Sequence, residues 1–267
     1  MRARLITIPF SHFCEKARWG LDRAGAAYDE EMHAPGFHLL ATKARGRGRA
    51  TPVWIDEHGE VTTDSTAILL RLDERTPRAL RLYPEDASER ATIVALEEEL
   101  DHSIGPAARR IAYHHLFRHA PATAVAMIGA RGPSWQRAIV RRAPGLLQRM
   151  LDRALDLSEA ATERSQRKLD AALERLDARL RDARREGRSW LSGTTFGAAD
   201  LTLASLLSPF LAPPEHPFRY PSAEAMPAAL RALSLRIAQS ETGELVSRAY
   251  REERARRPGL DVDRATH

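Results

Sequence analysis

The spacing of apolar side chains divides the chain into a short N-terminal part that contains strands and a longer part that is helical throughout. Residues 4–8 (RLITI) are mostly apolar and β-branched and are followed by Pro9, so they predict a strand. Residues 12–25 predict a helix, with Ser11 as its N-cap and Gly25 as the residue that ends it. The chain therefore begins with a strand that leads directly into a helix.

The remainder of the first eighty residues mixes strands and helices. Residues 28–33 predict a second strand, and residues 34–50 predict a loop or a short helix. Residues 53–55 and 61–63 predict the two strands of a hairpin, and residues 65–75 predict a helix. This part therefore predicts a small α/β unit.

The chain after Pro84 shows only the helical period. Residues 87–119 are amphipathic, with a break expected at Gly105-Pro106, and glycines and prolines divide residues 120–157 into short helices. Further helices are predicted over residues 158–186, 198–208 and 228–255. We therefore expect two domains, over residues 1–80 and 88–257.

Composition narrows the class of protein. Apolar residues make up 43% of the 267 residues, which is typical of a globular protein, and no apolar run approaches the length of a membrane span. The 41 basic and 36 acidic residues are interleaved, so the net charge of +5 does not predict a nucleic-acid surface. A lone cysteine fits a reducing compartment. We expect a cytoplasmic protein without a membrane or nucleic-acid partner.

The junction between the first strand and its helix is the first candidate site. Ser11 stands at the helix N-cap and Cys14 in the first turn. Free backbone N–H groups and the helix dipole stabilise a thiolate at such a position. The alternative is purely structural: Ser11 caps the helix and Cys14 is a small buried side chain. From these residues alone, the structural alternative is favoured.

Two further motifs lie near the hairpin. Pro52, in Thr51-Pro52-Val53, directly precedes an apolar strand, where a cis peptide bond would let the backbone of Val53 pair with an added peptide strand. A trans proline at a strand entrance is an equally good interpretation. At Asp64-Ser65, the helix start offers a hydroxyl and free amides to a carboxylate, and Asp64 offers a charge to an ammonium group. An ordinary N-cap explains the same residues.

The order and spacing of these motifs resemble the soluble glutathione transferases. In the helical half, Trp190-Leu191-Ser192-Gly193 and Phe196-Gly197-Ala198-Ala199-Asp200-Leu201 resemble the entry to that family's buried helix. Gly197 stands where the family usually has serine or threonine, so the hydroxyl half of a capping box is missing. The resemblance implies a thioredoxin-like N-terminal domain followed by an all-helical C-terminal domain.

The resemblance also implies a ligand and roles for the candidate residues. Glutathione would be the co-substrate, with its thiolate hydrogen-bonded by Ser11. The segment Thr51, Pro52 and Val53 would hold its cysteinyl backbone, and Asp64 and Ser65 its γ-glutamyl end. Arg49 would offer a cation to its glycyl carboxylate. Cys14 takes the second position of the family's redox Cys-x-x-Cys pattern, where serine at the first position prevents a disulfide cycle.

Three functions remain open: conjugation of glutathione to small, mostly apolar electrophiles, thiol reduction through Cys14, or non-catalytic binding. The resemblance implies a homodimer and places the electrophile between the domains, near Tyr113, Phe117 and Trp135. Lys16 and Arg18 are expected to be solvated helix charges. His115 and His119 have the spacing of a metal pair, but no nearby acid completes a signature, so no metal site is predicted.

Overall fold

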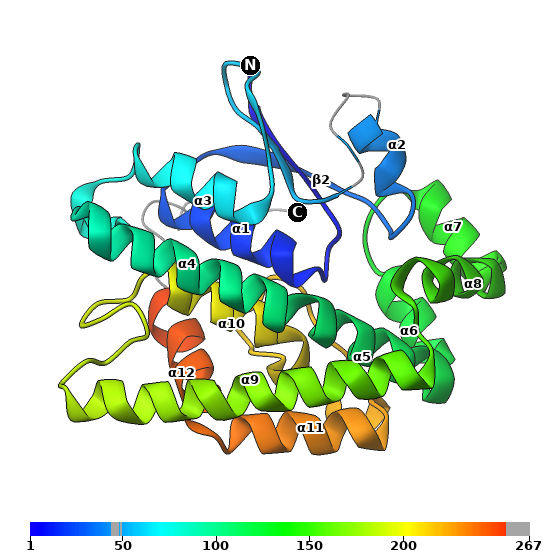
Figure 1. Ribbon diagram of the computed structural model, residues 1–267. Helices are drawn as coiled ribbons and strands as arrows, with labels where there is room; N and C mark the ends of the chain where they lie inside the picture. The colour runs from blue at the N-terminus through cyan, green and yellow to red at the C-terminus, as the bar shows by residue number, and fades with distance from the viewer. Residues whose placement is uncertain (44–47, 49, 255–267) are drawn as a thin grey trace.

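The computed structural model describes residues 1–43, 48 and 50–254 and shows a small sheet seated on a larger group of helices (Figure 1). The N-terminal unit consists of β1 (Ala3–Thr7), α1 (His12–Arg23), β2 (Tyr28–Met32), α2 (His38–Lys43), β3 (Val53–Ile55), β4 (Val61–Thr63), α3 (Ser65–Asp73) and the 3-10 turn η1 (Arg78–Leu80).

The sheet of this unit has the strand order β2-β1-β3-β4. β1 and β2 are parallel, as a helical crossover through α1 requires, whereas β3 pairs antiparallel with both β1 and β4. The predicted strands, the hairpin and both long helices are confirmed. In the predicted loop-or-helix segment, six residues form α2.

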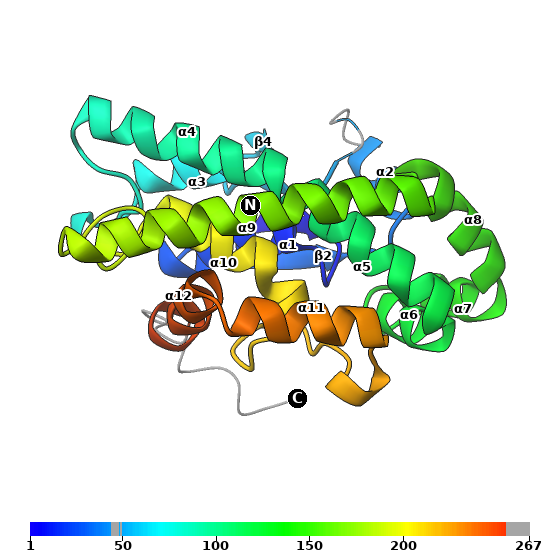
Figure 2. The same cartoon turned by 60° about the horizontal axis from the view of Figure 1, so that its bottom comes forward.

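All named elements in the described residues after η1 are helices, joined by turns and loops. They are α4 (Ala87–Ser103), α5 (Gly105–His119), α6 (Pro121–Ile128), α7 (Ser134–Arg142), α8 (Pro144–Leu155), α9 (Glu159–Arg185), α10 (Ala198–Leu211), η2 (Ala223–Ala225), α11 (Ala228–Ala238), α12 (Glu241–Ala249) and the π-helical η3 (Tyr250–Arg254). In Figure 2, α6, α7 and α8 gather at one end of α5 and α9. None of these described helices combines the length and apolarity needed to cross a bilayer.

Two helix boundaries have local causes. The expected break at Gly105 lets α5 approach α1, because a Cβ at residue 105 would lie 2.4 Å from Cζ of Phe13. The single helix predicted over residues 228–255 is wrong. It is interrupted before Ser240, whose Oγ accepts the N–H of Gly243 at 3.1 Å and caps α12.

The helix α10 is the centre of the fold. Nearly all of its residues are buried, as its uniformly apolar sequence predicts, and it packs against α1, α4 and α12. Asp200 fixes its start by accepting the N–H groups of Leu191, Ser192 and Gly197 at 2.7–3.2 Å. Because α10 touches α1, the core of the helical part directly supports the first strand-to-helix junction.

Candidate functional site

The N-terminus of α1 presents Ser11 to an open space. Ser11 has extended backbone angles, and its Oγ accepts the N–H of Cys14 at 3.5 Å, so it is the predicted N-cap. Its side chain is half-buried and lines a cavity. Since the oxygen accepts a bond from the backbone, the hydroxyl proton of Ser11 is available to a ligand.

Cys14 lies behind this surface. Its side chain is fully buried, and its Sγ accepts the N–H of Ile8 at 3.4 Å. Burial is the largest influence on this thiol and raises the pKa of Cys14, although the charge of Arg18 and the N–H of Ile8 act in the opposite direction. The structural interpretation of Cys14 therefore fits the geometry better than a catalytic one.

The Thr51–Pro52 peptide bond is cis, which decides between the two interpretations of this motif. Thr51 lines the same cavity as Ser11. Val53 does not offer a free strand edge: it pairs with Ile6 on one side and with Thr63 on the other. The expectation that Val53 accepts an added strand is therefore wrong, and the residues of this segment that line the cavity, Ala50 and Thr51, come before the proline.

Asp64 and Ser65 form the N-terminus of α3. Asp64 has a φ of 78°, and one carboxylate oxygen accepts the N–H groups of Thr66 and Ala67 at 2.9 and 3.1 Å. Ser65 is buried. The cap interpretation of Asp64 is confirmed, and neither residue lines the cavity that Ser11 and Thr51 share. Arg49 lies outside the described residues.

The cavity lies between the N-terminal unit and the helical part, with a volume of about 520 Å³. Its walls are mostly apolar, and half of the lining residues come from α5, α8 and the loop before α1. Its apolar lining includes Phe10, Leu116, Met127, Leu151 and Leu155. Its polar lining includes Ser11, Thr51, Arg109, Tyr113 and Tyr220. Such a space suits a small apolar molecule with few polar groups.

Two groups set the charge near Ser11. Burial, assisted by the positive charge of Arg109, lowers the pKa of His12 to about 3, so this imidazole is neutral at pH 7. Arg109 is exposed on the cavity wall, and among the described residues it has no hydrogen bond or ion pair. The cavity wall therefore carries one free cation beside a neutral histidine.

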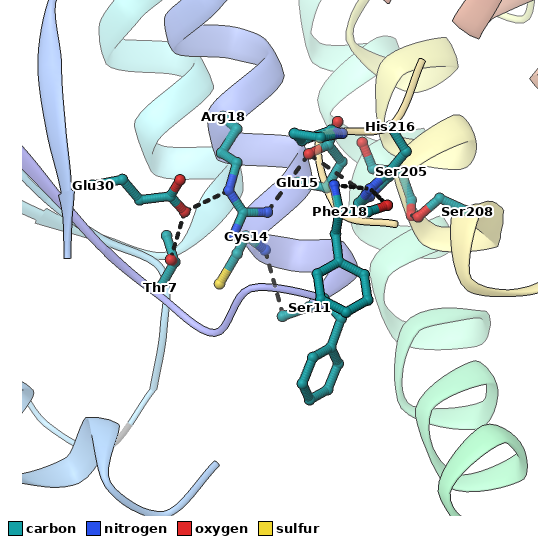
Figure 3. Close-up of polar contacts among 12 residues, drawn as sticks. Thr7, Ser11, Cys14, Glu15, Arg18, Glu30, Ser205, Ser208, His216 and Phe218 are labelled. Atoms are coloured by element: carbon teal, nitrogen blue, oxygen red, sulfur yellow. Dashed lines mark hydrogen bonds and ion pairs between the residues drawn. The ribbon is translucent and has the colours of Figure 1, made fainter. Parts of the chain in front are cut away.

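A buried ion network holds α1 in place. Figure 3 shows Arg18 between Glu30 and Glu15: its Nε donates to Glu30 at 2.6 Å, and its Nη1 lies 3.6 Å from Glu15. Arg254 donates to Glu15 at 2.8 Å from the far end of the chain. Burial disfavours ionisation of Glu15, but Arg254 and the other neighbouring cations outweigh it and lower its pKa.

Lys16 forms a second such contact. Its Nζ lies 2.8 Å from both Glu97 and Asp101 on α4 and 2.7 Å from Thr66 on α3. The expectation that Lys16 and Arg18 are solvated is wrong, because both side chains are buried and paired. Their ion pairs fix α1 to its neighbours instead of charging the surface.

Several lining residues escaped the sequence analysis. Tyr220 comes from the proline-rich connection after α10, and its hydroxyl donates to the carbonyl of Phe10 at 3.4 Å. Met150 and Leu151 come from α8. No local sequence pattern marks these residues as part of a cavity wall. Phe117 is buried behind Tyr113 and Trp135 is exposed, and neither lines the cavity.

Comparison with family models identifies both halves of the chain. The model described as "Glutathione S-transferase, N-terminal domain" matches residues 5–80, and the one described as "Glutathione S-transferase, C-terminal domain" matches residues 159–238. The chain belongs to the glutathione S-transferase family. Comparison with curated protein sequences finds no match.

Solved structures of two glutathione transferases and one β-etherase share the fold. A transferase from Ceriporiopsis subvermispora in complex with glutathione is 17% identical, with 97% of this chain and 100% of that chain covered and a TM-score of 0.62. GSTFuA3 from Phanerochaete chrysosporium is 19% identical, with coverage of 95% and 97% and a TM-score of 0.60. The β-etherase LigF from Sphingobium sp. strain SYK-6 is 18% identical, with coverage of 92% and 98% and a TM-score of 0.55.

Residues 81–158 of this transferase-family chain lie between the two matched segments. They include α5 and α8, which form much of the apolar cavity wall. The matched N-terminal segment supplies Ser11 and Thr51. The cavity thus combines a wall from the family's N-terminal domain with a wall from the intervening helices.

Proposed function

We propose that this protein conjugates the thiolate of glutathione to small, mostly apolar electrophiles. One observation carries the proposal: the half-buried hydroxyl of Ser11, at the N-terminus of α1, opens into an apolar cavity between the two parts of the chain. A thiol delivered to this position would meet both a hydrogen-bond donor and a space for its reaction partner.

The energetic requirement is modest. Lowering the pKa of a free thiol by about two units, from ~8.5, requires about 2.7 kcal/mol of preferential stabilisation of the thiolate. A hydrogen bond to a charged group contributes roughly 1.5–3 kcal/mol, and a helix N-terminus adds about 0.3–1 kcal/mol. Ser11 and α1 together match this requirement. The thiolate sulfur would then attack the electrophilic carbon, forming a C–S bond as the leaving group departs.

The remaining candidates would hold the tripeptide. The backbone of Thr51, turned by the cis bond to Pro52, would pair with the cysteinyl residue, while Val53 anchors this segment in the sheet. Ser65, at the first position of α3, would receive the γ-glutamyl carboxylate. Asp64 keeps one carboxylate oxygen for the ammonium group, since the other accepts both backbone bonds. Arg49 remains the proposed partner of the glycyl carboxylate.

Thiol reduction through Cys14 is disfavoured because its thiol is fully buried and its pKa is raised. The conjugation proposal carries two further expectations from the family: a homodimer, and a cytoplasmic location where glutathione is kept as the thiol. Non-catalytic binding is separated from conjugation by the following experiment.

The test is a conjugation assay with glutathione and an activated aryl halide, comparing Ser11→Ala, Cys14→Ala and Ser240→Ala. We expect Ser11→Ala to lower kcat about 10–100-fold, since it removes the donor to the thiolate. Ser240→Ala removes an N-cap serine from a helix that does not line the cavity, so it controls for cap loss. Cys14→Ala retains activity. Loss of turnover in Cys14→Ala but not in Ser11→Ala would contradict the assignment.

A further inference from the structure

The helices α7 and α8 carry apolar side chains on their outer surface. Trp135 and Ile139 of α7 are 49% and 42% exposed, and Leu146 and Met150 of α8 are 62% and 39% exposed. The other large apolar side chains exposed in the described residues are Met1, Leu40 and Leu235. Most of the exposed apolar surface of this kind is therefore concentrated on two adjacent helices.

Both helices repeat the same outward pattern. On α7, Trp135, Ile139 and Arg142 are spaced by four and three residues, so they share one face. On α8, Leu146, Met150 and Arg153 repeat this spacing. The side chains that bury these helices lie on another face and include Val140, Leu147 and Leu151. A surface helix with one buried face normally has polar side chains on its other face. The second, exposed apolar stripe on α7 and α8 therefore indicates that another molecule contacts this face.

The charge around these stripes is strongly positive. Between residues 134 and 155 the chain has Arg137, Arg141, Arg142, Arg149 and Arg153 against one acid, Asp152. Four of the arginines (141, 142, 149 and 153) are exposed and have no hydrogen bond or ion pair with any described residue. Several exposed arginines of α9, in contrast, lie near carboxylates, such as Arg167 with Glu163.

This surface borders the mouth of the cavity. Met150 belongs both to the exposed stripe of α8 and to the cavity wall. It also packs closely on Gly36, before α2, where an added Cβ would lie 2.5 Å from its Cε. The ring of Trp135 meets Phe37 edge-on, with centroids 5.3 Å apart. Whatever covers α7 and α8 therefore lies next to the entrance.

We propose that the outer face of α7 and α8 docks on an anionic lipid surface. Apolar side chains flanked by unpaired arginines are the composition of helices that lie in the membrane interface, with the apolar groups among the acyl chains and the guanidinium groups at the phosphates. The cytoplasmic leaflet supplies the negative charge. Two copies of this face related by a two-fold axis would instead bring arginines against arginines.

Such docking is peripheral and differs from the sequence expectation of no membrane partner. Docking would place the mouth of the cavity at the membrane surface, so that apolar electrophiles dissolved in the lipid could pass from the lipid into the cavity. Docking itself does not depend on the proposed conjugation, so either can fail alone.

The test is co-sedimentation of the full chain with phosphatidylcholine vesicles, with and without phosphatidylserine. We expect binding only to the anionic vesicles, weakening as salt is added. The double variants Trp135→Ser/Leu146→Ser and Arg142→Gln/Arg153→Gln should each lower the binding constant about tenfold or more. All four positions are exposed, so the variants should fold, which circular dichroism checks.

Matched controls lie on other helices. Leu235→Ser removes an equally exposed leucine from α11, and Arg179→Gln/Arg181→Gln removes two exposed charges from α9. Both controls should bind like the unaltered chain. The proposal is overturned if the chain ignores anionic vesicles, if controls and α7–α8 variants weaken binding equally, or if light scattering shows that the α7–α8 variants instead break up an oligomer.

Discussion

At the scale of single residues, burial separates the two candidate groups of the first helix. Ser11 and Cys14 lie three residues apart and are linked by one hydrogen bond, yet Ser11 reaches the cavity and Cys14 does not. A thiolate needs a polar or positive environment, and full burial removes that advantage from Cys14. The hydroxyl is therefore the group available for chemistry.

Cys14 should be unreactive in the native protein. It is the only cysteine, so a thiol-reactive aromatic disulfide reports on it alone. Because reaction requires opening of the core, we expect labelling in native buffer to be at least about a hundredfold slower than in urea. Ser88→Cys, at an exposed position of α4, supplies a fast control. Rapid native labelling of Cys14 would support the thiol-reductase alternative.

The sequence revealed these residues but not their surroundings. Helical period and capping were enough to place Ser11 and the start of α1, because both depend on neighbours in the chain. The burial of Lys16 and Arg18 depends on carboxylates far away in sequence, such as Glu97 and Glu30. Local sequence patterns contain no information about such contacts. For the same reason they did not predict that Tyr220 lines the cavity.

At the scale of elements, the start of α10 shows how a missing cap can be a packing requirement. If only hydrogen bonds are considered, Gly197 weakens the family's capping box, because it has no hydroxyl. A Cβ there would lie 2.6 Å from Oγ of Ser192 and 2.9 Å from the carbonyl oxygen of Leu82. The glycine therefore allows the loop before α10 and the segment after α3 to approach closely.

A substitution that supplies the missing cap hydroxyl, Gly197→Ser, should therefore destabilise the folded protein. A serine N-cap gains only a few tenths of a kcal/mol over glycine, whereas overpacking costs about 1–3 kcal/mol. We expect Gly197→Ser to lower the free energy of unfolding by about 1–3 kcal/mol in urea denaturation. Adding Ser192→Gly to this variant should recover part of the loss, because it removes the Oγ that the new side chain would meet. An equally stable or more stable Gly197→Ser protein would show that the contact relaxes freely.

At the scale of the whole molecule, buried charges join the two parts of the chain. Glu15 of α1 faces Arg254 from η3 and His216 from the connection after α10, whose Nε2 lies 3.8 Å away. Burial is the main influence on His216 and lowers its pKa to about 4. At a pH between about 4 and 6.5, His216 is therefore neutral in the folded protein and protonated in the unfolded chain.

This difference makes stability depend on pH. A folded pKa of about 4 lies below the ordinary 6.5, so the contribution of His216 is present above pH 6.5 and is lost as the pH falls toward 4. Between pH 7 and pH 5 the loss from this group is about 2 kcal/mol. His216→Asn should reduce the measured loss in the free energy of unfolding by that amount. Equal losses in the variant and the unaltered protein would contradict the assignment.

The proposed conjugation requires stabilisation of a sulfur anion at the N-terminus of α1, which ultraviolet titration of the thiol of bound glutathione measures. The predicted result is an apparent pKa about two units below the ~8.5 of a free thiol, shifted back toward that value in Ser11→Ala. A bound thiol that titrates like free glutathione, or identically with and without the Ser11 hydroxyl, would rule out thiolate stabilisation by Ser11 and α1.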